Sequence, residues 1–295
     1  MTDPMQQEQD LPISPSELVE NVSGLVTLPD VYLRISRAIE SPRSSSADIA
    51  KAVSQDASFT VRLLKLANSA LYGFPAKIDS VGKAITLIGI AQVRNLTLSM
   101  SVARSFAGLP NDLVSMENFW MHSLLCALCA RHLAGEMRRC DPDALFTAGL
   151  LHDVGELIIF NRLPDKATQA LLMVLDSQEE LMVHEAEQAV MGFDHGVVGG
   201  LLAKRWNLPP LLEECITHHH DIGQAKQFPR EVALIHLANV FSLMAELDTL
   251  NLGDVEPIDP LAWERSDLAV DVIEPTVRKA QAEMSELRQL VLDTP

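Results

Sequence analysis

The chain has 295 residues, of which 47% are hydrophobic and 5% aromatic, and its 40 acidic residues outnumber its 23 lysines and arginines. A chain of this length and apolar content can bury a large core in one or two domains. Its net charge of −17 argues against non-specific nucleic-acid binding, because a phosphate backbone would repel such a chain.

The cysteine content and the apolar segments indicate where the protein works. Four cysteines are too few for a disulfide framework, which indicates a reducing compartment. The polar, glutamine-rich start does not resemble a signal peptide, and no apolar run is long enough to span a bilayer. We therefore expect a cytoplasmic protein without membrane attachment.

Helical periodicity predicts an all-α protein with two helical lobes. Residues 1–13 are polar and predict a disordered tail. Residues 14–110 form the expected N-terminal lobe, with capped amphipathic helices and a boundary at Gly108–Asn111. The first helix of this lobe is expected to begin near Ser14–Glu17. The following helices are expected at 29–39, 47–53, 57–67, 81–88 and 91–107, with caps at Ser46, Asp56 and Ser80 for the second, third and fourth of these.

Residues 111–250 form the expected second lobe, with helices over 116–136, 195–206 and 232–247. Asp141 starts a predicted helix that contains His152 and Asp153. Residues 251–295 predict a loop and a last amphipathic helix from about 271 to 292. That helix either mediates self-association, which would give a homodimer, or packs on the core of its own chain.

His152 and Asp153 are adjacent in an otherwise apolar segment, residues 149–156. Each group loses several kcal/mol of hydration when it is buried alone, and a divalent cation compensates for that loss. Imidazole and carboxylate ligands together suit Fe, Mn, Zn or Ni. Alternatively, the pair makes a hydrogen bond that pins a helix and binds no metal.

Most of the nine histidines fall in the second lobe, at or beside apolar helical faces. A binuclear metal site needs three or four of them to converge, because each ion requires several protein ligands and room for water. The positions concerned are His122, His152, His195, the run His218–His219–His220 and His236.

Several stretches of the first lobe resemble the HDOD family of bacterial signalling proteins. They are residues 56–70, 78–80, 84–89 and 93–96, and the resemblance extends over about residues 25–241. Asn68, Ser69 and Arg94 are polar positions of this pattern. They either form a ligand or partner surface or make hydrogen bonds at helix ends.

The resemblance extends to the wider HD phosphohydrolase superfamily, which implies an HD-like second lobe. There, a first histidine, an adjacent His-Asp pair and a late aspartate hold a metal, and further histidines hold a second metal in the HD-GYP relatives. The resemblance matches these ligands with His122, His152, Asp153, His195, His219 or His218, and Asn239 in the place of the late aspartate.

Three departures from the HD-GYP pattern weaken the case for a cyclic di-GMP phosphodiesterase. Asn239 offers a neutral oxygen where the relatives have an anion. Glu156 replaces the usual lysine, which would attract phosphate, and no Gly-Tyr-Pro follows the histidine run. The expected metal site is therefore partial.

Three functions remain open from the sequence. The favoured one is a non-catalytic or weakly catalytic signal-transduction module that binds a signalling protein or a nucleotide second messenger. The second is a metal-dependent phosphohydrolase that acts on a nucleotide or cyclic dinucleotide. The third is a scaffold without metal, whose histidines hydrogen-bond to one another.

Overall fold

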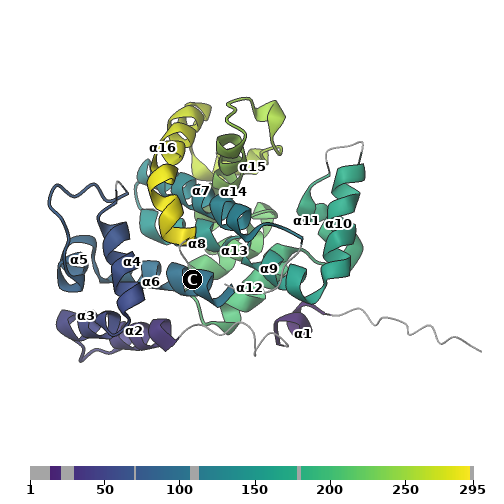
Figure 1. Cartoon of the computed structure of the whole chain (residues 1–295). Coiled ribbons are helices and arrows are strands. Elements are labelled where there is room, and N and C mark those ends of the chain that lie inside the picture. Colours follow the sequence, from purple (N-terminus) through teal and green to yellow (C-terminus); the bar gives the residue numbers. More distant parts are fainter. Residues whose placement is uncertain (1–13, 21–29, 70, 107–112, 178–180, 293–295) are drawn as a thin grey trace, which may run out of the picture.

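The computed structural model describes residues 14–20, 30–69, 71–106, 113–177 and 181–292 (Figure 1). All regular elements within these ranges are helices, which confirms the all-α fold. The predicted tail, 1–13, and the predicted boundary, 108–111, lie outside the described residues. Among the described residues no single helix is long and apolar enough to cross a membrane, although a pair that bends by 115° at Gly89 passes the same test when joined.

The N-terminal lobe consists of five helices that pack on one another. The predicted caps at Asp56 and Ser80 are confirmed, since each side chain accepts a hydrogen bond from the first turn of its helix. The predicted cap at Ser46 is wrong by one residue, because Ser45 caps the second of the five helices and Ser46 is its first residue. The helices are α2 (Asp30–Glu40), α3 (Ser46–Ser54), α4 (Ala57–Ala67), α5 (Val81–Ile88) and α6 (Ile90–Phe106).

The second lobe is built around α7 (Met116–Gly135), whose middle is fully buried and rich in small side chains. It packs against α8, α14 and α16. The other α-helices are α8 (Pro142–Leu151), α9 (Val154–Arg162), α10 (Pro164–Asp176), α11 (Val183–Met191), α12 (His195–Arg205), α13 (Pro210–His218), α14 (Pro229–Glu246), α15 (Pro260–Ser266) and α16 (Ile273–Leu292). Short 3-10 turns are η1 (Ile222–Gln224), η2 (Leu252–Asp254) and η3 (Val270–Val272).

The helices at the two ends of the chain both pack on the second lobe. The first, α1 (Pro15–Glu20), buries Leu18 and Val19 against α9 and α12 and so packs on the second lobe, although the sequence placed it in the first. The last helix, α16, packs on α7 and α14 and also reaches α4 of the first lobe.

Two predicted helix boundaries were wrong. The helix expected to contain His152 and Asp153 ends at Leu151, and α9 begins at Val154. The sequence predicted a loop over residues 250–260 and no helix from there to residue 271, but α15 begins at Pro260, with Asp259 as its cap. The Asp259–Pro260 pair could have predicted the start of this helix, because proline suits the first position of a helix.

Candidate metal centre

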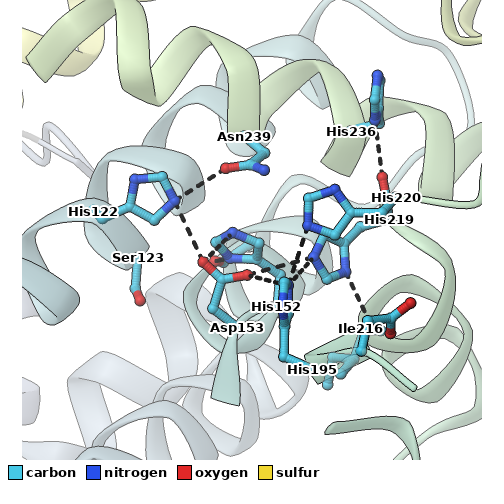
Figure 2. Close-up of polar contacts among 12 residues, drawn as sticks. His122, Ser123, His152, Asp153, His195, Ile216, His219, His220, His236 and Asn239 are labelled. Atoms are coloured by element: carbon cyan, nitrogen blue, oxygen red, sulfur yellow. Dashed lines mark hydrogen bonds and ion pairs between the residues drawn. The ribbon is translucent and has the colours of Figure 1, made fainter. Parts of the chain in front are cut away.

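The break between α8 and α9 directs the side chains of His152 and Asp153 toward the centre of the second lobe (Figure 2). His152 still has helical torsions, φ −57° and ψ −38°, whereas Asp153 has φ −96° and ψ 11°. The latter values lie in the sparsely populated region between helix and strand, where many active-site residues are found. The turn therefore presents both side chains at one junction rather than on successive faces of a helix.

Close packing of α9 on α12 brings Asp153 within reach of His195. A Cβ atom at Gly155 would lie 2.0 Å from the carbonyl oxygen of His195 and 2.7 Å from the backbone nitrogen of Gly199. Only a residue without a side chain fits between the two backbones. Gly199 and Gly200 on α12 allow a similar close approach, because Cβ atoms there would collide with the side chains of Ile216 and Thr217 on α13.

The two carboxylate oxygens of Asp153 face two different sets of imidazoles. Oδ2 lies 2.9 Å from Nε2 of His152 and 3.4 Å from Nε2 of His122. Oδ1 lies 3.4 Å from Nε2 of both His195 and His219. Asp153 is thus placed to bridge two neighbouring ligand groups.

Hydrogen bonds on the far side of each ring fix which nitrogen points inward. Nδ1 of His152 donates to the carbonyl of Gly149 at 2.7 Å, and Nδ1 of His219 donates to that of Ile216 at 2.9 Å. Because a carbonyl can only accept, the proton of a neutral ring lies on Nδ1 and Nε2 carries a lone pair.

Carboxylates hold the other two rings in the same way. Nδ1 of His195 lies 2.7 Å from Glu187, and Nδ1 of His122 lies 2.8 Å from Glu246. Metal-binding histidines in proteins almost always have such a partner on the second nitrogen, because it fixes the ring and raises its basicity. Glu187 and Glu246 were not identified from the sequence, since neither is near its histidine along the chain.

With the rings so oriented, lone pairs face one another at the centre. Nε2 of His152 is fully buried and makes no hydrogen bond, although Asp153 Oδ2 is 2.9 Å away, because both atoms are acceptors. Nε2 of His195 lies 3.2 Å from that of His219 and 3.1 Å from that of His220. Only a proton or a cation can join such pairs.

The donor atoms fit divalent transition metals. Among the described residues, three groups of side chains could hold an ion, with ligand atoms within 4.8 Å of one another in each. One consists of His122, His152 and Asp153, another of Asp153, His195, His219 and His220, and a third of Glu156, Glu187 and His195. The first two share Asp153, and we refer to them as the two ligand groups. Ligands at about 2.1 Å from a shared ion lie about 3 to 4 Å apart, so the spacing is suitable. Imidazole-rich sites of this kind take Zn, Fe, Mn or Ni.

The charges in the cluster are strongly coupled. Burial alone would lower the pKa of His122 and His195, but Asp153 with Glu246 and Glu187 holds both pKa values well above the ordinary range. Burial opposes ionisation of Asp153, yet the surrounding imidazoles hold its pKa well below its usual value. Burial lowers the pKa of His219 to about 4. The cluster therefore favours positive charge at its centre.

The structure brings together all but one of the predicted metal ligands. Asn239 on α14 places Oδ1 3.0 Å from Nε2 of His122. His218 is half-buried at the end of α13 and joins neither group, whereas His220, from the same run, joins the second. A run of three histidines cannot reveal which of them turn inward, because that depends on where α13 ends.

His236 has a structural role beside the cluster. Its Nδ1 donates to the carbonyl of His219 at 2.9 Å, and its Nε2 accepts from the backbone N–H of Asp259 at 3.1 Å. Both ring nitrogens are thereby used. His236 therefore holds the backbone of a candidate ligand in place and does not itself face the centre.

The three polar positions of the first lobe have separate environments. The side chain of Asn68 bonds both backbone groups of Ile78 and the carbonyl of Leu64. Ser69 donates to the carbonyl of Leu66, and Arg94 on α6 is half-buried. For Asn68 and Ser69 the structure thus shows helix-end hydrogen bonds, the second of the two expected roles.

A cavity of about 470 Å³ opens onto the cluster. His122, Asp153, His195 and His220 line its inner wall, so both ligand groups face it. Its other walls combine apolar side chains with carboxyl groups. A cavity of this volume is within the range that holds small molecules.

Comparison with known proteins agrees with this architecture. The HDOD domain family model matches residues 25–222. The crystal structure of an HDOD domain protein of unknown function from Geobacter sulfurreducens is 25% identical, with a TM-score of 0.73, over 95% of this chain and 98% of that one. A Shewanella amazonensis SB2B protein, provisionally named a phosphohydrolase, is 22% identical, with a TM-score of 0.75, over 93% and 97% of the two chains.

At that lower identity the likeness to the Shewanella protein shows the fold alone. An uncharacterised protein of Treponema pallidum is 25% identical over 226 residues, which are 76% of this chain and 43% of that protein. The chain thus spans less than half the length of this relative. Because the family model covers most of the sequence, the chain belongs to the HDOD domain family.

Proposed function

We propose that this chain is a metal-dependent HDOD signalling module that binds divalent transition metals at the Asp153 cluster and a small ligand in the adjacent cavity. One observation carries the metal assignment. Nε2 of His152 is buried, has its lone pair free because Nδ1 donates to Gly149, and lies 2.9 Å from another acceptor, Asp153 Oδ2. Two such atoms at this separation have the spacing of neighbouring ligands on one ion.

In this proposal the chain's own residues orient the metal ligands and exclude water from the site. Glu187 and the carbonyls of Gly149 and Ile216 keep three imidazoles turned inward. The buried faces of the helices around the cluster keep water away from all but the cavity side. When bound, divalent ions supply positive charge for an anionic ligand and make water a better nucleophile at neutral pH.

Two features favour ligand binding over rapid turnover. Asn239 contributes a neutral oxygen, so the first ligand group has one anionic member, Asp153, which it shares with the second. Among the described residues, no lysine or arginine lines the cavity to stabilise charge on a reacting phosphate. We propose that the ligand-bound state is read by a partner protein, in the cytoplasm, where the four free cysteines would stay reduced.

The first test is metal content in protein purified without a histidine tag or chelator. We expect up to two ions per chain in the wild type, one for each ligand group. His152→Ala should lose at least the ion of the first group, because it removes a fully buried ligand. His218→Ala is the matched control, since it changes a neighbouring histidine outside both groups, and it should keep the wild-type content.

Absence of metal in the wild type after exposure to Zn, Mn and Fe would contradict the proposal. Equal loss in His152→Ala and His218→Ala would also contradict it, because the loss would then not depend on the cluster.

Phosphohydrolase activity is the second candidate, and the position of the cavity favours it. His122 from one ligand group and His220 from the other both line the wall, so a phosphate ester in the cavity would contact both. This candidate predicts phosphate release from a nucleotide by protein loaded with Mn or Fe. If protein shown to hold metal released phosphate from none of a panel of nucleotides, phosphohydrolase activity would be ruled out.

A further inference from the structure

His220 is supported differently from the other candidate histidine ligands. Acceptors on Nδ1 orient the rings of His122, His152, His195 and His219. The described residues provide no such acceptor for Nδ1 of His220. Even so, Nε2 of His220 lies 3.1 Å from Nε2 of His195, inside the second ligand group (Figure 2). Another kind of contact must therefore hold this ring in place.

The ring of His184 lies against the face of His220. Their centroids are 4.0 Å apart, and the two ring planes differ by 16°. The rings of His195 and His219 also contact His220, but at angles of 86° and 49°. Stacked rings attract each other through their faces. The nearly parallel contact with His184 therefore fixes the plane in which His220 lies.

Hydrogen bonding does not account for the position of His184. Its Nδ1 is buried without a hydrogen-bond partner among the described residues, and no hydrogen bond joins its ring to any of them. A buried nitrogen without a partner is a cost to the fold. The ring lines the cavity wall together with His220. Its stacking contact with His220 is thus the interaction that the position provides.

The helix α11 supports two members of the second ligand group from one side. His184 and Glu187 are three residues apart, so both side chains lie on the same side of the helix. Glu187 accepts from the backbone N–H of His195 at 2.8 Å and lies 2.7 Å from its Nδ1. The first turn is fixed in addition, because Glu185 accepts from the backbone N–H of Met182 at 3.0 Å.

We propose that His184 is a positioning residue of the metal centre, which holds His220 by stacking so that Nε2 of His220 points at the ion of the second ligand group. The lone pair of Nε2 lies in the ring plane, so the contact that fixes this plane also directs the lone pair. His184 acts through His220 and belongs to none of the described groups that could hold an ion. The inference rests on the metal-binding function proposed above and extends it.

Zinc affinity of the full chain tests this role. The metal-free protein is titrated with zinc in competition with a chromophoric chelator. We expect His184→Ala to weaken binding of one ion about tenfold, as is typical when the support of a metal ligand is removed. The ion that His152→Ala loses should stay near its wild-type affinity, because His152 belongs to the other ligand group.

Two further variants separate stacking from other effects. His184→Phe keeps a flat ring but has no nitrogen that could bind an ion, so it should restore the zinc affinity to near that of the wild type. His218→Ala is the control for removal of a histidine, since His218 is outside every candidate group, and it should keep the wild-type affinities.

A double substitution tests whether His184 acts through His220. His220→Ala removes the supported ring, so His184→Ala should cause no further loss of zinc affinity when both changes are combined. A further loss in the double variant would overturn the inference, because His184 would then act on the ion directly or through the fold.

Failure of this inference is distinguishable from failure of the metal centre. Wild-type zinc affinities in His184→Ala would overturn the inference alone, since the ions would be bound without the stacked ring. An equal loss in His184→Phe and His184→Ala would overturn it as well. A wild-type chain that binds no zinc would contradict the proposed metal centre, and the role of His184 with it.

Discussion

At the scale of single residues, the candidate site depends on which nitrogen of each imidazole carries the proton. Four rings are held by an acceptor on Nδ1, and in each case the other nitrogen faces the centre. Backbone carbonyls, Glu187 and Glu246 thus determine which nitrogen of each ring is protonated. These acceptors hold the rings in the orientation for metal binding before any ion arrives.

Gly155 is the residue on which this arrangement most clearly depends. Gly155→Ala would place Cβ 2.0 Å from the carbonyl of His195, so α9 and α12 must separate. We expect a loss of about 3 kcal/mol in the free energy of unfolding and a fall in metal content, because Asp153 and His195 would move apart. Urea denaturation and elemental analysis measure the two effects.

Gly82→Ala is the matched control for this substitution. No atom outside its own helix lies within 4 Å of a Cβ at Gly82, which is exposed on α5. Its stability and metal content should stay close to those of the wild type. If Gly155→Ala behaved in the same way as Gly82→Ala, the close contact of α9 with α12 would not be needed for the site.

At the scale of elements, Glu214 fixes the segment that precedes α14, the helix of His236 and Asn239. Its carboxylate accepts from the backbone N–H groups of residues 226, 227 and 228. Partial burial raises the pKa of Glu214, but these donors outweigh it and hold the pKa below the ordinary 4.5. The carboxylate therefore stabilises the fold in its ionised form.

The stabilisation by Glu214 should depend on pH. A depressed pKa gives stability that is fully present above 4.5 and is lost as the pH falls through the lower, folded-state pKa. At pH 7 we expect Glu214→Gln to cost about 1 kcal/mol, since one acceptor remains and solvent screens the charge. Urea denaturation should show the difference from wild type shrinking below pH 4.5. A difference that stayed constant to lower pH would contradict this role.

The sequence predicted most of the helices, because apolar residues recur with helical spacing and because Asp56 and Ser80 are conventional caps. It failed at the break after Leu151. No proline or glycine stands at positions 151–153, so nothing local marks the end of α8. The break is imposed by tertiary packing, in particular by the approach of α9 to α12 at Gly155.

The candidate site could likewise be predicted only in part. Six of the seven predicted metal-site residues converge. They could be named from the sequence because the family resemblance gives the order of the ligands along the chain. The choice of His220 over His218 depends on the last turn of α13, and the supporting Glu187 and Glu246 depend on contacts between helices. Neither kind of information is contained in residue spacing.

At the scale of the whole molecule, Arg131 on α7 joins the two lobes. Its guanidinium donates to the carbonyl of Leu71 at 2.5 Å, lies over the ring of Tyr72 at 4.8 Å, and is 3.4 Å from Asp143 on α8. Tyr72 in turn bonds Asp143 at 3.3 Å. The loop after α4 is thereby attached to two helices that lead to the metal centre.

Arg131→Met should weaken this attachment without removing the site. We expect a loss of about 2 kcal/mol in the free energy of unfolding, because a carbonyl and a carboxylate lose a charged donor. Metal content should be unchanged, since no ligand is altered. Arg138→Met, at an exposed position just after α7, is the control. Equal urea midpoints for the two variants would show that the contact contributes nothing.

The hydrogen bonds of His236 have a thermodynamic consequence. One ring nitrogen holds the backbone of His219, and the other holds that of Asp259, three residues after Glu256 on the cavity wall. If a ligand repositions this segment, it changes the affinity of the histidine group for its ion. Linkage then requires the ion to change the affinity for the ligand by the same factor. A single coupling free energy would describe both effects and could be read from whichever titration is easier.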